Sequence, residues 1–280
     1  MKILKTQVLV GAILLAGSAT SIFAQLKYTG CADVTKADFK KVPLVTSSQH
    51  RIEEPIQMAL AKDGRIFWIE RTGMLRMWEP SKPDAAVTLI SLPVFSENEF
   101  GASGIALDPG FEANKWIYAF WTVNTLNADG SRSFRVSRFT LANNALDMAS
   151  QKTILEIPVT NFGCCHTAGS MIFDFAGNLF IAVGNTTNNG SGESQTPKIN
   201  YVNQTDIHGD DQRGSSNTNS LLGKILRIKP KALSEGGASP APGVGSTYDI
   251  PAGNLFPAGQ YPAGKTRPEI YTMGHRNPYT

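Results

Sequence analysis

A dense group of reactive side chains, Cys164, Cys165 and His166, opens the stretch GCCHTAGSMIFDFAGNLFIAVGN (163–185). These residue types can hold a metal ion, exchange a disulfide or move a proton. Structural zinc sites usually place their cysteines about two to four residues apart, and redox dithiols use a C-x-x-C pattern, so adjacent cysteines fit neither. A disulfide within the pair, or one from Cys31 to either member, stays open.

His166 is a candidate general base, because a neutral imidazole can take a proton from a substrate hydroxyl at about pH 7. The alternative is a histidine that only packs at the entry to a strand. A second candidate is the segment GHRNP (274–278). Its Arg276 and Asn277 supply a fixed cation and an amide, which suit a planar ligand bearing carbonyls or carboxylates. Neither motif predicts a metal-ligand set.

The N-terminus predicts export. Lys2 and Lys5 precede the apolar run VLVGAILLAG, and small residues follow up to Ala24. This order is typical of a secretory signal peptide over 1–24, with an N-terminal extension over 25–51. The alternative, an uncleaved membrane anchor, is disfavoured because the run is shorter than the roughly 20 residues that span a bilayer. We therefore expect a secreted or periplasmic protein without stable membrane insertion.

Charge gives no sign of a nucleic-acid partner. Removing the two lysines of the signal peptide lowers the formal net charge from +3 to +1. A nearly neutral chain lacks the basic excess that attracts nucleic acid or an anionic membrane surface. Its length and 41% hydrophobic content suit one globular domain with a sizeable core.

Short apolar runs separated by Gly, Asp, Asn and Pro predict an all-β chain. Three segments resemble one another, each with an apolar strand, a glycine-containing turn and a very apolar second strand: 56–78, 103–122 and 169–185. Such units cannot bury their faces alone and stack on one another around an axis. The pattern predicts a β-propeller over 52–280, in preference to a β-sandwich.

The predicted propeller is incomplete. We count parts of about four blades, and we expect Pro268–Thr280 to open a further blade. The chain is thus expected to be the N-terminal part of a longer protein. Between blades, the polar segment Thr186–Asn219 is long enough for a functional loop.

In order along the chain, the motifs ENEFGASGIALDPGFEANKWIYAF, CHTAGSMIFDFAGNLFIAVGN, LLGKILRI and PEIYTMGHRNP resemble the glucose/sorbosone dehydrogenase family. The resemblance runs from about Ile52 to Thr280. It implies an exported six-bladed β-propeller that uses pyrroloquinoline quinone (PQQ) and calcium to oxidise an aldose or related sugar alcohol. It also implies an electron acceptor, soluble or respiratory, and calcium ligands in a C-terminal part beyond this chain.

The resemblance assigns roles to individual positions. His166 matches the base that removes the sugar hydroxyl proton, and Arg276 and Asn277 match residues that hold the quinone oxygens, Arg276 also stabilising the negative charge of reduction. Glu99 falls where the family often has a polar contact to substrate or cofactor. Asn185, nineteen residues after His166, stands where members often have an aspartate that orients the imidazole.

Two other functions remain open at this stage. A propeller of the same fold could bind carbohydrate or protein without catalysis. A lactonase-type calcium propeller would need acidic and asparagine ligands on its axis, and the sequence offers no convincing set.

Overall fold

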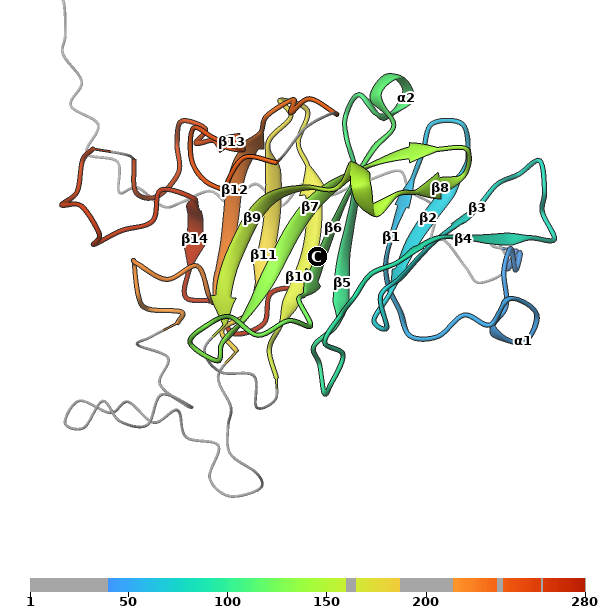
Figure 1. The fold of residues 1–280 in the computed structure, drawn as a ribbon, viewed down its shortest axis with the longest axis horizontal. Coiled ribbons are helices and arrows are strands. Elements are labelled where there is room, and N and C mark those ends of the chain that lie inside the picture. The colour runs from blue at the N-terminus through green and yellow to red at the C-terminus, as the bar shows by residue number, and fades with distance from the viewer. Residues whose placement is uncertain (1–39, 160–164, 187–213, 236–238, 258, 280) are drawn as a thin grey trace, which may run out of the picture. The chain divides into compact units, whose positions relative to one another are not determined.

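The computed structural model describes residues 40–159, 165–186, 214–235, 239–257 and 259–279. Within these residues the chain forms three antiparallel sheets that follow one another in sequence (Figure 1). The predicted signal peptide, 1–24, lies outside the described residues. None of the helices in the described part is long and apolar enough to cross a lipid bilayer.

The first sheet follows a short helix and has the strand order of the sequence. Its elements are α1 (Ser47–His50), β1 (Pro55–Leu60), β2 (Ile66–Glu70), β3 (Met74–Trp78) and β4 (Ala86–Ser91). The turns before β2 and β3 contain Gly64 and Gly73, with φ of +87° and +98°. Glycine reaches this left-handed region without a Cβ clash, so these turns close as the sequence predicts.

The second sheet lies between the first and the third, as the packing of its strand β6 shows. The elements are β5 (Ala102–Leu107), α2 (Phe111–Asn114), β6 (Trp116–Thr122), β7 (Arg132–Ala142), β8 (Ala145–Leu146), the 3-10 turn η2 (Met148–Ser150) and β9 (Lys152–Val159). In β6, Ile117 and Trp121 pack in one apolar cluster with the first sheet, while Tyr118 and Phe120 pack in another with the third. A strand buried on both faces requires a continuous apolar run, which WIYAFWT provides.

The third sheet corrects one prediction. It contains β10 (Ala168–Phe173), β11 (Leu179–Val183), β12 (Lys224–Pro230), β13 (Tyr248–Asp249) and β14 (Ile270–Met273). The sequence predicted that Pro268–Thr280 would open a new blade, but β14 pairs with β12 and joins the third sheet. The described residues therefore make three sheets rather than parts of about four blades.

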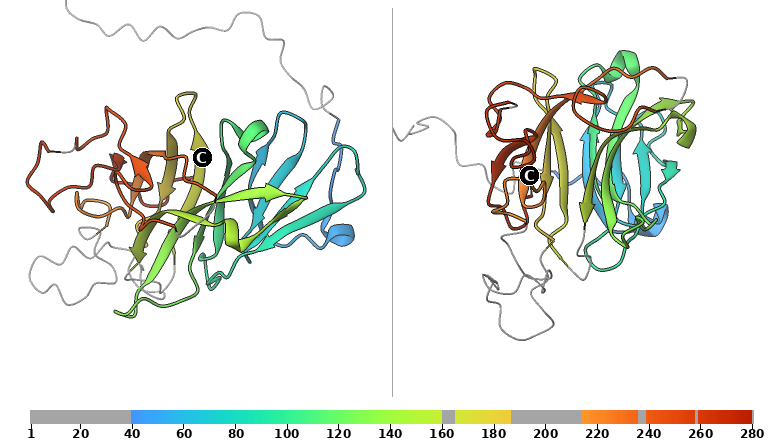
Figure 2. Two further views of the ribbon diagram at one scale, coloured as in Figure 1. Left: turned by 45° about the horizontal axis from the view of Figure 1, so that its top comes forward. Right: turned by 60° about the vertical axis from the view of Figure 1, so that its left-hand side comes forward.

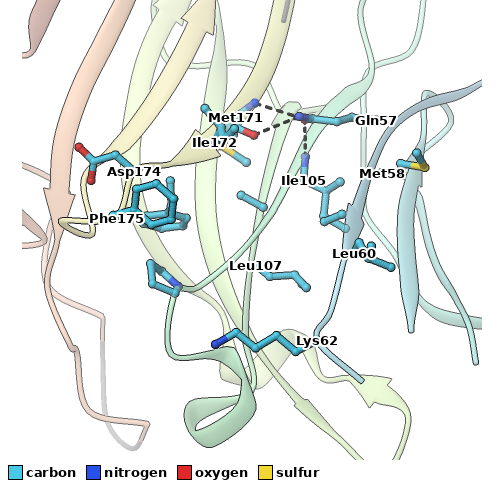
Figure 3. Close-up of a pocket in the computed structure, with 14 residues that line it drawn as sticks. Gln57, Met58, Leu60, Lys62, Ile105, Leu107, Met171, Ile172, Asp174 and Phe175 are labelled. Carbon is cyan, nitrogen blue, oxygen red and sulfur yellow. Dashed lines mark hydrogen bonds between the residues drawn. The ribbon is translucent and has the colours of Figure 1, made fainter. Parts of the chain in front are cut away.

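The first strands of the three sheets lie next to one another, with β5 in contact with both β1 and β10 (Figures 1 and 2). Their later residues line an open pocket of about 650 Å³, with exposed side chains of Met58, Leu60 and Ile172 (Figure 3). Three sheets that stack face to face around their first strands form a propeller arrangement. A sandwich of two sheets would not bury both faces of the middle sheet.

Gln57 of β1 joins all three sheets through its side-chain amide. Its Oε1 accepts hydrogen bonds from the backbone N–H groups of Ile105 (3.0 Å) and Met171 (3.2 Å), and its Nε2 donates to the Met171 carbonyl (3.0 Å) (Figure 3). Strands β5 and β10 thus depend on one glutamine of β1 for these bonds.

We expect Gln57→Ala to lower the free energy of unfolding by about 3 kcal/mol, because it leaves backbone donors of two strands without their acceptor. Gln260→Ala, at an exposed position, is the matched control and should stay within about 0.5 kcal/mol of wild type. Urea unfolding of the three proteins measures the difference. Equal stability of the two variants would contradict this role for Gln57.

Candidate active site

His166 begins a strained segment directly before β10. Its φ is +66°, and that of Ala168 is +51°. The left-handed region costs a non-glycine residue roughly 1–2 kcal/mol, so the surrounding structure must hold both residues there. We call His166–Ala168 the His166 loop. Only 3% of His166 is exposed.

The His166 imidazole is bonded to Asn185, which follows β11. Strands β10 and β11 pair as an antiparallel hairpin with Ala168 opposite Val183, so the residues that flank its open end meet. His166 Nδ1 lies 2.9 Å from Asn185 Oδ1. An amide oxygen has no hydrogen to donate, so Nδ1 carries the proton. In the neutral ring the lone pair is then on Nε2.

Glu99, from the segment before β5, contacts the same loop. Its Oε2 accepts a hydrogen bond from the His166 backbone N–H at 2.6 Å. Its carbonyl accepts another from the Thr167 hydroxyl at 3.1 Å. The Glu99 side chain therefore reaches His166, and its contact with substrate or cofactor stays a prediction.

The GHRNP segment after β14 lies on the other side of the loop. Asn277 Oδ1 accepts a hydrogen bond from the Ala168 N–H at 3.0 Å, and the Arg276 carbonyl accepts one from the Asn185 N–H at 2.9 Å. The Arg276 side chain is exposed and forms no ion pair with any residue that the structure describes. The fold thus brings together all five predicted site residues, although Arg276 joins through its backbone.

The cysteine beside His166 is not a free thiol. Cys165 is in a disulfide, so it is not a thiolate available to bind zinc. Its two possible partners, Cys31 and Cys164, both lie outside the described residues. Across the described ranges, no group of three or more His, Cys, Asp or Glu side chains could hold a metal ion.

Lys224, at the start of β12, is a neighbour of the site that sequence reasoning missed. Its fully buried ammonium donates to the carbonyls of Gly214, Ser215 and Leu222 at 2.8–2.9 Å. Ser215 in turn donates its hydroxyl to the carbonyl of His275, next to Arg276. The signal was present in the sequence, since Lys224 alternates with the buried Leu226 and Ile228 and must share their face.

Burial lowers the pKa of Lys224 from 10.5 to about 8. Between these values the unfolded chain binds more protons at this lysine than the folded chain, so stability rises with pH. We expect the lysine to cost up to about 3 kcal/mol below pH 8, and this cost to disappear by about pH 10.5. Urea unfolding of wild type and Lys224→Met at pH 7.5, 9 and 10.5 measures it. A constant difference between the two proteins would contradict the shift.

Comparison with known proteins gives a family for this arrangement. A family model described as Glucose / Sorbosone dehydrogenase matches residues 52–280. The uncharacterized protein slr1608 of Synechocystis sp. (strain PCC 6803) is 25% identical over 273 residues, and the match covers 93% of this chain and 56% of that protein.

Two solved structures share the fold. The apo-form of soluble aldose sugar dehydrogenase from Escherichia coli is 20% identical with a TM-score of 0.56, covering 82% of this chain and 53% of that one. The PQQ-bound form of aldose sugar dehydrogenase from Streptomyces coelicolor is 22% identical with a TM-score of 0.55, covering 81% and 52%. The chain spans little more than half the length of these relatives. With the three sheets, the matches confirm the predicted all-β propeller class.

Proposed function

Because the chain belongs to the glucose/sorbosone dehydrogenase family, we propose that it forms part of an exported quinoprotein that oxidises an aldose or related sugar alcohol. PQQ is the proposed cofactor, and a soluble or respiratory acceptor takes the electrons. The single observation that carries the proposal is the His166–Asn185 hydrogen bond, which fixes a histidine in the tautomer that a general base needs.

The residues around His166 are compatible with PQQ. This planar quinone carries several carboxylates, and the exposed guanidinium of Arg276 has no carboxylate partner among the described residues. Arg276 would bind oxygens of the quinone and stabilise negative charge there. For calcium, the described residues contain no group of three or more His, Cys, Asp or Glu side chains that could bind it.

The chain's own residues would act as follows. His166 Nε2 takes the proton of the sugar hydroxyl as the hydride leaves the carbon that bears it. Asn185 Oδ1 holds Nδ1 and keeps the ring in one orientation, stabilising the resulting imidazolium through the amide dipole. When bound, PQQ supplies the carbonyl carbon that accepts the hydride.

An assay of the natural full-length protein tests the proposal. The protein is incubated with PQQ and calcium, passed through gel filtration, and assayed for dye reduction with a panel of aldoses. We expect the quinone absorbance to elute with the protein and at least one aldose to reduce the dye. Loss of the absorbance and no reduction with any sugar would overturn the enzyme hypothesis and favour a propeller that only binds carbohydrate or protein.

Asn185 provides a graded test of the base. Asn185→Asp places a charge on the same hydrogen bond, and charge-assisted bonds are about twice as strong, so we expect a roughly fivefold increase in kcat. Asn185→Leu removes the acceptor and should lower kcat by about tenfold or more. The kcat of each variant and of wild type, measured at saturating sugar and quinone, tests both expectations. An unchanged kcat in both variants would exclude Asn185 from orienting His166.

A further inference from the structure

The backbone of the His166 loop is bonded at both ends by side chains from other parts of the fold. The N–H of His166 donates to the Glu99 carboxylate, and the N–H of Ala168 donates to the Asn277 amide oxygen. Glu99 lies 67 residues before His166, and Asn277 lies 109 residues after Ala168. Two segments remote in sequence therefore meet at a loop of three residues.

His166 and Ala168, whose N–H groups make these bonds, are the two residues of the loop that have left-handed backbone conformations. The left-handed region is unfavourable for residues with a Cβ, so the loop holds this conformation only where specific contacts stabilise it. A hydrogen bond from each strained residue's own N–H is such a contact. The Glu99 bond is the shorter, at 2.6 Å, and its acceptor is a carboxylate, which makes it charge-assisted.

Three further hydrogen bonds engage other polar groups of the loop. Thr167 donates its hydroxyl to the Glu99 carbonyl, so Glu99 binds the loop through both its side chain and its backbone. The His166 carbonyl accepts the Thr186 N–H, and the Thr167 carbonyl accepts the Gly184 N–H. These hydrogen bonds restrain the loop backbone and thereby fix the orientation of the His166 ring.

We propose that Glu99 and Asn277 are positioning residues that clamp the His166 loop and thereby orient the imidazole. The inference rests on the proposed function for the role of His166. Each side chain places an oxygen on a backbone N–H of the loop. Glu99 thus supports the base from the segment before the second sheet, and Asn277 supports it from the segment after β14 of the third sheet.

The first test needs no cofactor. In the protein without quinone, labelled with ¹⁵N, NMR detects the His166 Nδ1 proton and the amide protons of His166 and Ala168. We expect Glu99→Ala to speed exchange of these protons by at least tenfold, and Glu99→Gln, which keeps an acceptor oxygen, to stay within threefold of wild type. Glu97→Ala, an exposed neighbour in the same segment, is the matched control. Wild-type exchange in Glu99→Ala would overturn the clamp.

The second test separates positioning from cofactor contact. With PQQ and calcium, Glu99→Ala should lower kcat by at least tenfold while the quinone Kd changes less than threefold, and Glu99→Gln should restore kcat. At the other end, Asn277→Ala should speed exchange of the Ala168 amide proton in the first test, and Asn277→Asp, which keeps an acceptor oxygen, should stay within threefold of wild type. A tenfold weaker quinone Kd with unchanged kcat at saturation would overturn the proposal. If wild type neither binds quinone nor turns over, the proposed function fails, and the exchange data alone decide the clamp.

Discussion

His166→Ala should lower sugar-dependent dye reduction by about a hundredfold to ten-thousandfold, the range that a positioned general base contributes. The physical reason is that the hydroxyl proton then has no acceptor as the hydride leaves. Quinone binding should be nearly unaffected, because the proposed cofactor contact of this chain is Arg276. The kcat at saturating sugar and the quinone Kd, measured on the same preparation, separate the two effects.

His50→Ala is the matched control, since His50 lies in α1 before the first sheet and bonds to the Asp84 carbonyl and the Thr46 backbone. It should leave kcat within about twofold of wild type. A His166→Ala variant with normal turnover would remove His166 from the mechanism. Equal losses in both histidine variants would indicate a general effect on folding.

Gly184→Ala should strongly destabilise the protein. A Cβ at Gly184 would lie 1.6 Å from the His166 carbonyl oxygen and 2.3 Å from its carbon, and both are backbone atoms that no rotamer change can move. The φ of Gly184 is not in the left-handed region, so the cost comes from this contact alone. We expect a loss of about 3 kcal/mol in the free energy of unfolding and a displaced His166.

Gly243→Ala is the control for this variant, because a Cβ there meets nothing within 4 Å. Urea unfolding should place it within about 0.5 kcal/mol of wild type. In the folded fraction of Gly184→Ala, kcat should also fall at least tenfold, as the ring of His166 moves with its carbonyl. Wild-type stability together with wild-type kcat in Gly184→Ala would contradict the close packing of this loop.

Local sequence patterns predict those parts of the structure that depend on one hairpin or one strand. The hairpin of β10 and β11 follows from alternating apolar runs around Ala-Gly-Asn, and its register brings His166 and Asn185 together. The buried position of Lys224 could have been found in the same way, from its alternation with Leu226. In each case the deciding contacts are close in sequence or lie on one strand.

Contacts between segments that lie far apart in the sequence could not be predicted. Glu99 and Asn277 were assigned to ligand contacts by resemblance, and their hydrogen bonds to the His166 loop were not foreseen, because the fold brings together segments that are far apart in the sequence. Strand β14 was assigned to a new blade because its apolar pattern suits an opening strand equally well. Only its pairing with β12, across the long excursion after Pro230, places it in the third sheet.

The central claim is that this site oxidises sugar with His166 as the base. The most direct measurement is a single turnover without oxygen or external acceptor, in which quinone-loaded full-length protein is mixed with aldoses and the quinone absorbance is followed. We predict that at least one aldose reduces the bound quinone, and that His166→Ala slows this step by about a hundredfold or more. An unchanged absorbance of the quinone bound to wild type, with every aldose, would contradict the claim.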